Sequence, residues 1–261
     1  MAAARVGTRS TAKGSTLTTL NEPEPSPAAQ PEENVPPARR TLVSSEGTFV
    51  FHAMALLCYA RVWLWHFTPA AAVLPGATGF GWFFRYLTFY SFTLQFGTLL
   101  LCCIAALPGD AHRRAVLHRW TDDMSCALFG LANVVTIMYY AIATATNDIV
   151  EGGAVPRPPW LGFSVHVFNS LIAWADLLIS HPRSFSPRAE KISMLLTSLY
   201  TSWILLCSHF NGVFPYPFLN KMAWPQGFIG IVVASHVVFY IMFHAGKRLS
   251  APILRWKLKK E

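Results

Sequence analysis

Two side chains in the apolar part of the sequence have the types and the spacing that ester hydrolysis requires. Thr88 lies six residues after Trp82, and His166 lies six residues after Trp160. Tryptophan is enriched where a membrane helix meets the lipid headgroups, so both side chains are expected at one depth, about 9 Å below that level. A threonine hydroxyl becomes a nucleophile when a base removes its proton, and histidine is the usual base near neutral pH. Such a pair could attack a lipid ester through an acyl-threonine intermediate.

Both residues also have interpretations that involve no chemistry. A threonine in a membrane helix most often donates its hydroxyl to the carbonyl group four residues earlier. An intramembrane histidine can instead bond a neighbouring helix. Three further residues are candidates for binding the substrate or supporting the pair, namely Arg61, Asn169 and His209. Asn169 lies one turn below His166, and Arg61 could either bind a carboxylate or extend to the membrane surface.

The composition predicts the elements that must position these residues. The chain has 261 residues, of which 53% are hydrophobic and only 13% are charged. Soluble domains carry about 25% charged residues, so a membrane protein is indicated. After Arg85 the chain has no charge for 22 residues. Such a run is long enough for a helix to cross a hydrocarbon core of about 30 Å.

Six apolar segments of this kind predict an all-α membrane protein, a six-helix transmembrane bundle. The segments are 48–67, 82–107, 120–146, 160–180, 192–210 and 226–245. The predicted domains are a disordered tail at 1–45, a six-span domain at 46–247 and a basic tail at 248–261. The flanks and loops of one side carry 14 Lys and Arg residues against two on the other. Basic loops stay in the cytosol, so both termini are predicted to be cytosolic.

The same features exclude several function classes. The net charge of +8 comes from residues at the ends of spans, where cationic side chains meet headgroups, so nucleic acid is not an expected partner. The expected partners are membrane lipids and a lipid ester substrate, with no obligate protein partner. The five cysteines lie in apolar runs without a CxxC pair. We therefore expect neither a metal site nor a cofactor.

Four motifs resemble the androgen-induced-gene-one family, which includes the androgen-dependent TFPI-regulating protein. They are YLTF at 86–89, PPWLGFSVH at 158–166, ISHPRSFSPR at 179–188 and SHFNGVFPYPFL at 208–219. The resemblance implies a six-span, threonine-type hydrolase of fatty acid esters of hydroxy fatty acids. It places the family's threonine on Thr88 and its histidine on His166. Gly162 and Phe163 stand where relatives often have Asn-His, which marks this chain as a divergent member.

Two other functions remain open at this stage. A non-enzymatic transporter or receptor would also have six spans, although the sequence has no clear internal repeat. A transmembrane haem electron carrier would need facing histidine pairs, and the second span has no histidine. Lys257 and Lys259 resemble a dilysine retrieval signal, which predicts residence in the endoplasmic reticulum.

Overall fold

The computed structural model describes residues 45–146, 158–180 and 182–259, and this part of the chain is helical without a β-strand. All of these residues belong to one unit, Ala38–Glu261. Helices are expected because a hydrocarbon environment offers no partners for backbone N–H and C=O groups, which a helix pairs internally. The predicted tail at 1–45 lies outside the described residues apart from its last position, so its disorder stays a prediction.

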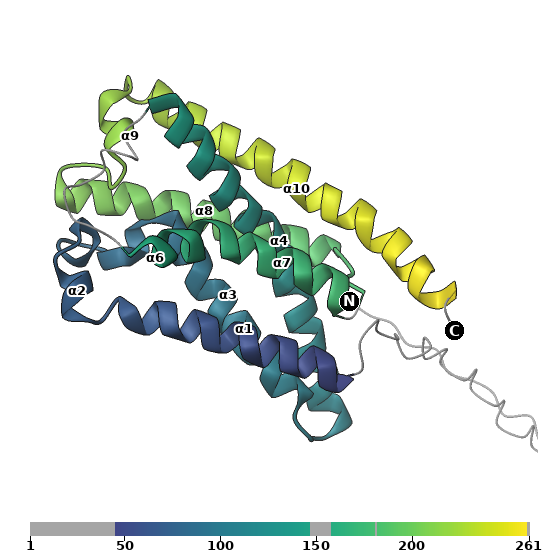
Figure 1. Ribbon diagram of the computed structural model, residues 1–261. Helices are drawn as coiled ribbons and strands as arrows, with labels where there is room; N and C mark the ends of the chain where they lie inside the picture. Colours follow the sequence, from purple (N-terminus) through teal and green to yellow (C-terminus); the bar gives the residue numbers. More distant parts are fainter. Residues whose placement is uncertain (1–44, 147–157, 181, 260–261) are drawn as a thin grey trace, which may run out of the picture. The chain divides into compact units, whose positions relative to one another are not determined.

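Six helical segments are long and apolar enough to cross a membrane, which confirms the predicted six-helix architecture (Figure 1). The chain is a multi-pass membrane protein. The long helices are α1 (Ser45–Trp65), α3 (Leu87–Ala106), α4 (Ala111–Thr146), α8 (Pro187–Asn211) and α10 (Gln226–Lys259), and the fourth span consists of α6 (Pro159–Phe163), η3 (Ser164–Phe168) and α7 (Asn169–Ile179). The short helices are α2 (Pro69–Ala72), η1 (Pro75–Ala77), η2 (Trp82–Arg85) and α9 (Pro217–Lys221).

Helix α4 is the centre of the bundle. It packs against α3, α7, α8 and α10, whereas α1 packs mainly against α3. Figure 1 shows α10 running alongside α4. The close approach of these two helices depends on Gly130 of α4, because a Cβ atom there would lie 2.5 Å from the ring of Phe239 of α10. Phe239 belongs to a buried cluster with Phe129, Phe185 and Phe243.

The outer face of α10 is apolar, as a lipid-facing surface requires. Ile229, Val233, Val237 and Ile241 recur every four residues and are each more than half exposed. Residues four apart lie on one face of a helix, so these side chains form a continuous stripe. In water such a stripe would favour aggregation, whereas in a bilayer it contacts acyl chains.

Several predicted boundaries were wrong. The predicted span 82–107 is not one helix, because η2 and an extended Tyr86 precede α3. Helix α4 begins at Ala111 rather than at 120, and its 36 residues extend over about 54 Å. Helix α10 continues to Lys259, so the predicted basic tail at 248–261 begins within this helix, and the division into domains stays a prediction. The cytosolic position of both termini and the endoplasmic reticulum stay predictions.

Candidate active site

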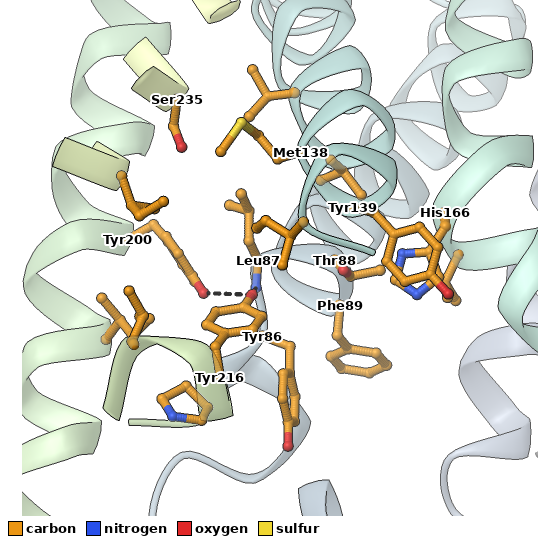
Figure 2. A pocket seen from close by; sticks show the side chains of 18 of the residues that line it. Tyr86, Leu87, Thr88, Phe89, Met138, Tyr139, His166, Tyr200, Tyr216 and Ser235 are labelled. Carbon is orange, nitrogen blue, oxygen red and sulfur yellow. Dashed lines mark hydrogen bonds between the residues drawn. The ribbon is translucent and has the colours of Figure 1, made fainter. Parts of the chain in front are cut away.

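One pocket of about 380 Å³ brings together parts of the second to sixth spans and His66, which directly follows the first span. Its lining is mostly apolar and includes Leu131, Val134, Leu161, Ile204 and Phe239. We call it the Thr88 pocket, because Thr88 lines it together with His166 (Figure 2). Its other polar residues are His66, Tyr86, Tyr139, Thr197, Tyr200, Thr201, Tyr216, Ser235 and His236. No Asp, Glu, Lys or Arg is found among the described residues that line it.

Thr88 is the second residue of α3, and this position decides what its hydroxyl can bond. The residue four positions earlier, Phe84, lies in η2, and its carbonyl group accepts a hydrogen bond from Trp203 Nε1 at 3.2 Å. The Thr88 hydroxyl has no hydrogen-bond partner within the part of the chain that the structure describes. It therefore remains available to a ligand in the pocket.

Other threonines of the bundle differ in this respect. The hydroxyl groups of Thr93, Thr98, Thr197 and Thr201 each donate to the carbonyl group four residues earlier, at 2.8 to 3.1 Å. This is the bond that a threonine in a regular membrane helix is expected to make. Thr88 escapes it because α3 begins only one residue before it. The helix boundary thus distinguishes Thr88 from its neighbours.

His166 lies in η3, a five-residue π-helix within the fourth span. In an α-helix the His166 carbonyl group would accept from the N–H of Ser170. Here that N–H donates to Asn169 Oδ1 at 2.7 Å, and the His166 carbonyl accepts from the Thr136 hydroxyl at 2.6 Å. A π-helical turn inside an α-helix is rare and frequently accompanies a functional site. Side chains thus replace backbone bonds around His166.

The imidazole of His166 is held by an aromatic ring of α4. It stacks on Tyr139 with the ring centroids 3.6 Å apart and the planes 12° from parallel. Figure 2 shows this pair on the same side of the pocket as Thr88. Residues 88 and 166 therefore face one cavity from different spans, as their matched depth predicted, although Thr88 is not six residues into a continuous helix.

The start of α3 is fixed by two tyrosines. The Tyr216 hydroxyl accepts the Leu87 N–H at 2.7 Å and lies 3.1 Å from the Tyr200 hydroxyl, which donates to the Arg85 carbonyl at 3.0 Å. Burial raises the pKa of Tyr216 to about 12, so its hydroxyl stays protonated at neutral pH. No side chain caps the helix at Tyr86. The first-turn N–H groups after Leu87 lack acceptors within the helix and point toward its N-terminal end.

The three predicted supporting residues lie outside this pocket. Arg61 is exposed, and its guanidinium lies over the ring of Trp160 at 5.0 Å. His209 is exposed and contacts the ring of Phe210. Asn169 is fully buried, and its side-chain oxygen completes the backbone of η3. None of the three is placed to contact a molecule in the Thr88 pocket, and Asn169 acts on the backbone that carries His166.

The family comparison agrees with the six-span arrangement. The family model for FAR-17a/AIG1-like protein matches residues 47–251. The chain belongs to this family. The matched region begins in α1 and ends in α10, so it contains every wall of the Thr88 pocket. No curated protein and no solved structure matches the chain.

In this FAR-17a/AIG1-like protein, the sequence did not indicate which residues position Thr88 and His166. Thr136 and Tyr139 are three positions apart on α4, which is the spacing of neighbours on one helix face. Tyr216 lies in the PYP segment of the SHFNGVFPYPFL motif, and its place in this motif was the indication that the sequence offered for it. His66 also lines the pocket, and its Nδ1–H donates to the Val62 carbonyl at 2.8 Å.

The described residues contain no group of three or more His, Cys, Asp or Glu that could hold a metal ion.

Proposed function

We propose that this protein is an intramembrane hydrolase of lipid esters in which Thr88 is the nucleophile and His166 is the general base. The observation that carries the proposal is that a threonine hydroxyl without an internal partner and an imidazole line one apolar pocket. The finer substrate, a fatty acid ester of a hydroxy fatty acid, rests on the resemblance to the androgen-induced-gene-one family.

In the first step, the Thr88 oxygen attacks the ester carbonyl carbon while His166 takes the hydroxyl proton. The carbonyl π electrons move to its oxygen and form a tetrahedral oxyanion. When this species collapses, the bond to the leaving alkoxide breaks and His166 returns the proton to it. The products of the step are an alcohol and an ester between the acyl group and Thr88.

In the second step, His166 removes a proton from water, and the resulting hydroxide attacks the acyl-threonine carbonyl. Collapse releases a fatty acid, and the proton returns to the Thr88 oxygen. The proposal requires the hydroxyl and the imidazole to come within hydrogen-bond reach when substrate is bound. Catalytic hydrogen bonds are often long before substrate binds, so an unformed bond in the empty pocket does not oppose this requirement.

The N-terminal end of α3 supports the same steps. The aligned peptide dipoles of a helix leave partial positive charge at this end. Thr88 and Phe89 are the second and third residues of α3, so their N–H groups are first-turn donors close to the attacking oxygen. We assign them the role of stabilising the oxyanion, a role that backbone N–H groups fill in many acyl-transfer enzymes.

The pocket favours an acyl chain over a polar substrate. Its walls carry aliphatic and aromatic side chains from α4, α8 and α10. Without a charged side chain among its described lining residues, it offers no ion pair to a small polar ester. A lipid reaches such a site from the bilayer with its ester group already near the headgroup level.

The decisive experiment measures turnover of a panel of lipid esters by purified protein in detergent. We expect Thr88→Ala to lower kcat by at least about a thousandfold and His166→Ala by at least about a hundredfold. Thr88→Ser retains a hydroxyl and should keep measurable turnover. A fluorophosphonate probe should label Thr88, as read by mass spectrometry of peptides.

The matched control is Thr201→Ala. Thr201 lines the same pocket, but its hydroxyl donates to the Thr197 carbonyl at 2.9 Å. Its removal should change kcat by less than about fivefold, since a single neutral hydrogen bond contributes about 1 kcal/mol. Full turnover by Thr88→Ala, with Thr201→Ala equally active, would remove the nucleophile assignment.

One observation favours the alternative of a transporter or receptor. The fourth span is interrupted by the π-helix η3, and transporters often bind their substrates where a helix is broken. On that reading the pocket would bind a lipid without cleaving it. The panel separates the two functions, because a binding protein would retain the lipid esters intact and the probe would leave Thr88 unlabelled.

A further inference from the structure

A second pocket, of about 510 Å³, lies where α1 and α4 begin and α3 ends. This is the opposite end of α1 and α3 from the Thr88 pocket, whose walls include His66 after α1 and the first residues of α3. We call it the Arg183 pocket. Its polar lining residues are Glu46, Thr48, His52, Cys102, Arg114, His118, Thr121, Ser180 and Arg183. Because these residues lie at the ends of spans or within about three turns of them, we place the pocket near the level of the lipid headgroups.

Arg183 is fixed in this pocket by a buried carboxylate. Its Nη2 atom lies 2.6 and 2.8 Å from the two oxygens of Asp176, and its Nε atom lies 3.1 Å from Oδ2. Asp176 is not part of the pocket wall, so it holds the guanidinium from behind. The nearest acidic oxygen to Nη1 belongs to Asp122 at 3.8 Å, which exceeds a hydrogen-bond distance. Arg183 therefore keeps donor capacity at Nη1.

The neighbours of Asp176 do not form a hydrolytic triad. Ser180 Oγ and Asp176 Oδ1 both contact the same nitrogen of His52, Nε2, at 3.1 and 2.8 Å. Ser180 also donates directly to Asp176 at 2.5 Å. In a Ser-His-Asp triad the serine and the carboxylate bond opposite nitrogens of the imidazole. These side chains instead complete the hydrogen bonds of the carboxylate that positions Arg183.

Thr48 gives an independent indication of a ligand. It lies in the first turns of α1, and only 6% of its surface is exposed. Thr48 lines the Arg183 pocket, and its buried hydroxyl has no hydrogen-bond partner among the described residues. A buried hydroxyl without a partner is unfavourable, and a ligand oxygen in the pocket would supply that partner.

The remaining charges favour an anion. Arg114 and His118 reach the pocket from the first two turns of α4, and Glu46, which is exposed, is the one described acid in its wall. Helices α1 and α4 direct their N-terminal ends to this region, and α3 and α7 direct their C-terminal ends to it, with Ser180 directly after α7. The helix dipoles therefore oppose one another, and the donors for an anion are the side chains of Arg114, Arg183 and Thr48.

We propose that the Arg183 pocket binds the phosphate group of an anionic membrane lipid. The lipid source is favoured over free phosphate because the pocket wall continues into Phe49, Val50 and Leu107, which are between 37% and 57% exposed. These side chains offer an apolar path for the first carbons of an acyl chain. Arg114, Arg183 and Thr48 bind the phosphate oxygens. The proposal is independent of the hydrolase activity.

The test measures binding to the purified full-length protein in nonionic detergent by calorimetry. The probes are ether-linked dioctyl phosphatidic acid, the matching phosphatidylcholine and inorganic phosphate. Ether linkages keep any esterase from consuming the probe. Phosphatidic acid should bind at least about tenfold more tightly than either other probe, because a charge-assisted hydrogen bond contributes about 1.5–3 kcal/mol.

Variants assign the binding to this pocket. Arg114→Gln should raise the Kd for phosphatidic acid about tenfold and Thr48→Val about fivefold, whereas Thr48→Ser should bind like the natural protein. Arg113→Gln is the matched control, because Arg113 neighbours Arg114 on α4 but does not line the pocket. Equal Kd values for the two lipids would overturn the proposal. So would equal losses in Arg113→Gln and Arg114→Gln, or phosphate alone binding as tightly as phosphatidic acid.

Discussion

The imidazole of His166 stacks face to face on the ring of Tyr139, with centroids 3.6 Å apart. One turn earlier on the same helix, the Thr136 hydroxyl bonds the His166 carbonyl. Helix α4 thus constrains both the ring plane and the backbone of a residue that belongs to the fourth span. A general base, the role proposed for His166, must be oriented as well as close. Packing on Tyr139 fixes the ring here, since no acid lines the pocket within the described residues.

Replacing Tyr139 should therefore change the chemical step more than substrate binding. We expect Tyr139→Phe to keep most of the turnover, because it retains a ring, and Tyr139→Ala to lower kcat by about tenfold to a hundredfold with little change in KM. Steady-state kinetics on a lipid ester checks this. Tyr140→Ala is the control, since Tyr140 is 50% exposed and does not line the pocket. Equal losses in the two alanine variants would contradict an orienting role for Tyr139.

Tyr216→Phe should weaken both the fold and the activity. The change removes the acceptor of the Leu87 N–H, which is bonded at 2.7 Å, and leaves a donor unsatisfied at the start of α3. We expect a loss of about 1–3 kcal/mol in the free energy of unfolding. Turnover should fall as well, because the first turn of α3 carries Thr88. Thermal unfolding in detergent, followed by kinetics at a temperature where the variant is folded, separates the two effects.

His66 should make stability depend on pH. Burial lowers the pKa of His66 below its ordinary value of 6.5, although the Val62 carbonyl that accepts from it acts in the opposite direction. The unfolded chain then binds more protons than the folded chain at acidic pH, so stability rises with pH. This contribution is present above about pH 6.5 and is lost as the pH falls below that value.

We thus expect the Tm to fall between pH 7.5 and pH 5.5, and to fall less in His66→Gln. A His236→Gln variant serves for comparison, because His236 bonds its own helix in the same way, through Nδ1 to the Val232 carbonyl at 2.7 Å. An unchanged pH dependence in His66→Gln would show that other groups cause the fall.

Gly130→Ala should separate α4 from α10. The added methyl would lie 2.5 Å from the ring of Phe239, which is 1% exposed and belongs to a buried aromatic cluster. Overpacking of this kind costs about 1–3 kcal/mol, which outweighs the gain in helix propensity of up to about 1 kcal/mol. Gly230→Ala is the matched control, since nothing lies within 4 Å of its Cβ position. Thermal unfolding should give a lower Tm for the first variant and an unchanged or higher Tm for the second.

Hydropathy predicted six spans because a membrane helix must bury its backbone polar groups whatever its neighbours are. The depth of side chains in the membrane could also be predicted in part: Thr88 and His166 line one pocket, as their spacing from tryptophans predicted. Counting six helical residues from Trp82 gave the wrong position of Thr88 along its helix, because Trp82 lies in a separate 3-10 turn and the helix starts at Leu87. Hydropathy cannot detect that break, since Phe83 and Phe84 are as apolar as the helix that follows.

Rotation of each helix was the part that could not be predicted. Lipid-facing and core-facing side chains are both apolar, so the sequence offers no amphipathic pattern from which to choose a face. For this reason Arg61 and His209 were grouped with Thr88 by depth, although both are exposed outside the pocket. Asn169 was a candidate for supporting Thr88 and His166, but its side-chain oxygen bonds the backbone. The π-helical turn around His166, which leads to this bond, leaves no sequence signature.

Tyr86, the single extended residue before α3, determines whether the Thr88 hydroxyl has a hydrogen-bond partner in its own chain. Were Tyr86 wound into a regular helix with the turn before it, Thr88 would regain the carbonyl of Phe84, as Thr93 already holds that of Phe89. The backbone conformation of Tyr86 thus decides whether the Thr88 hydroxyl bonds its own helix or lacks a partner beside the pocket. A ligand or a mutation that straightened this junction would give the hydroxyl an internal partner without contacting it.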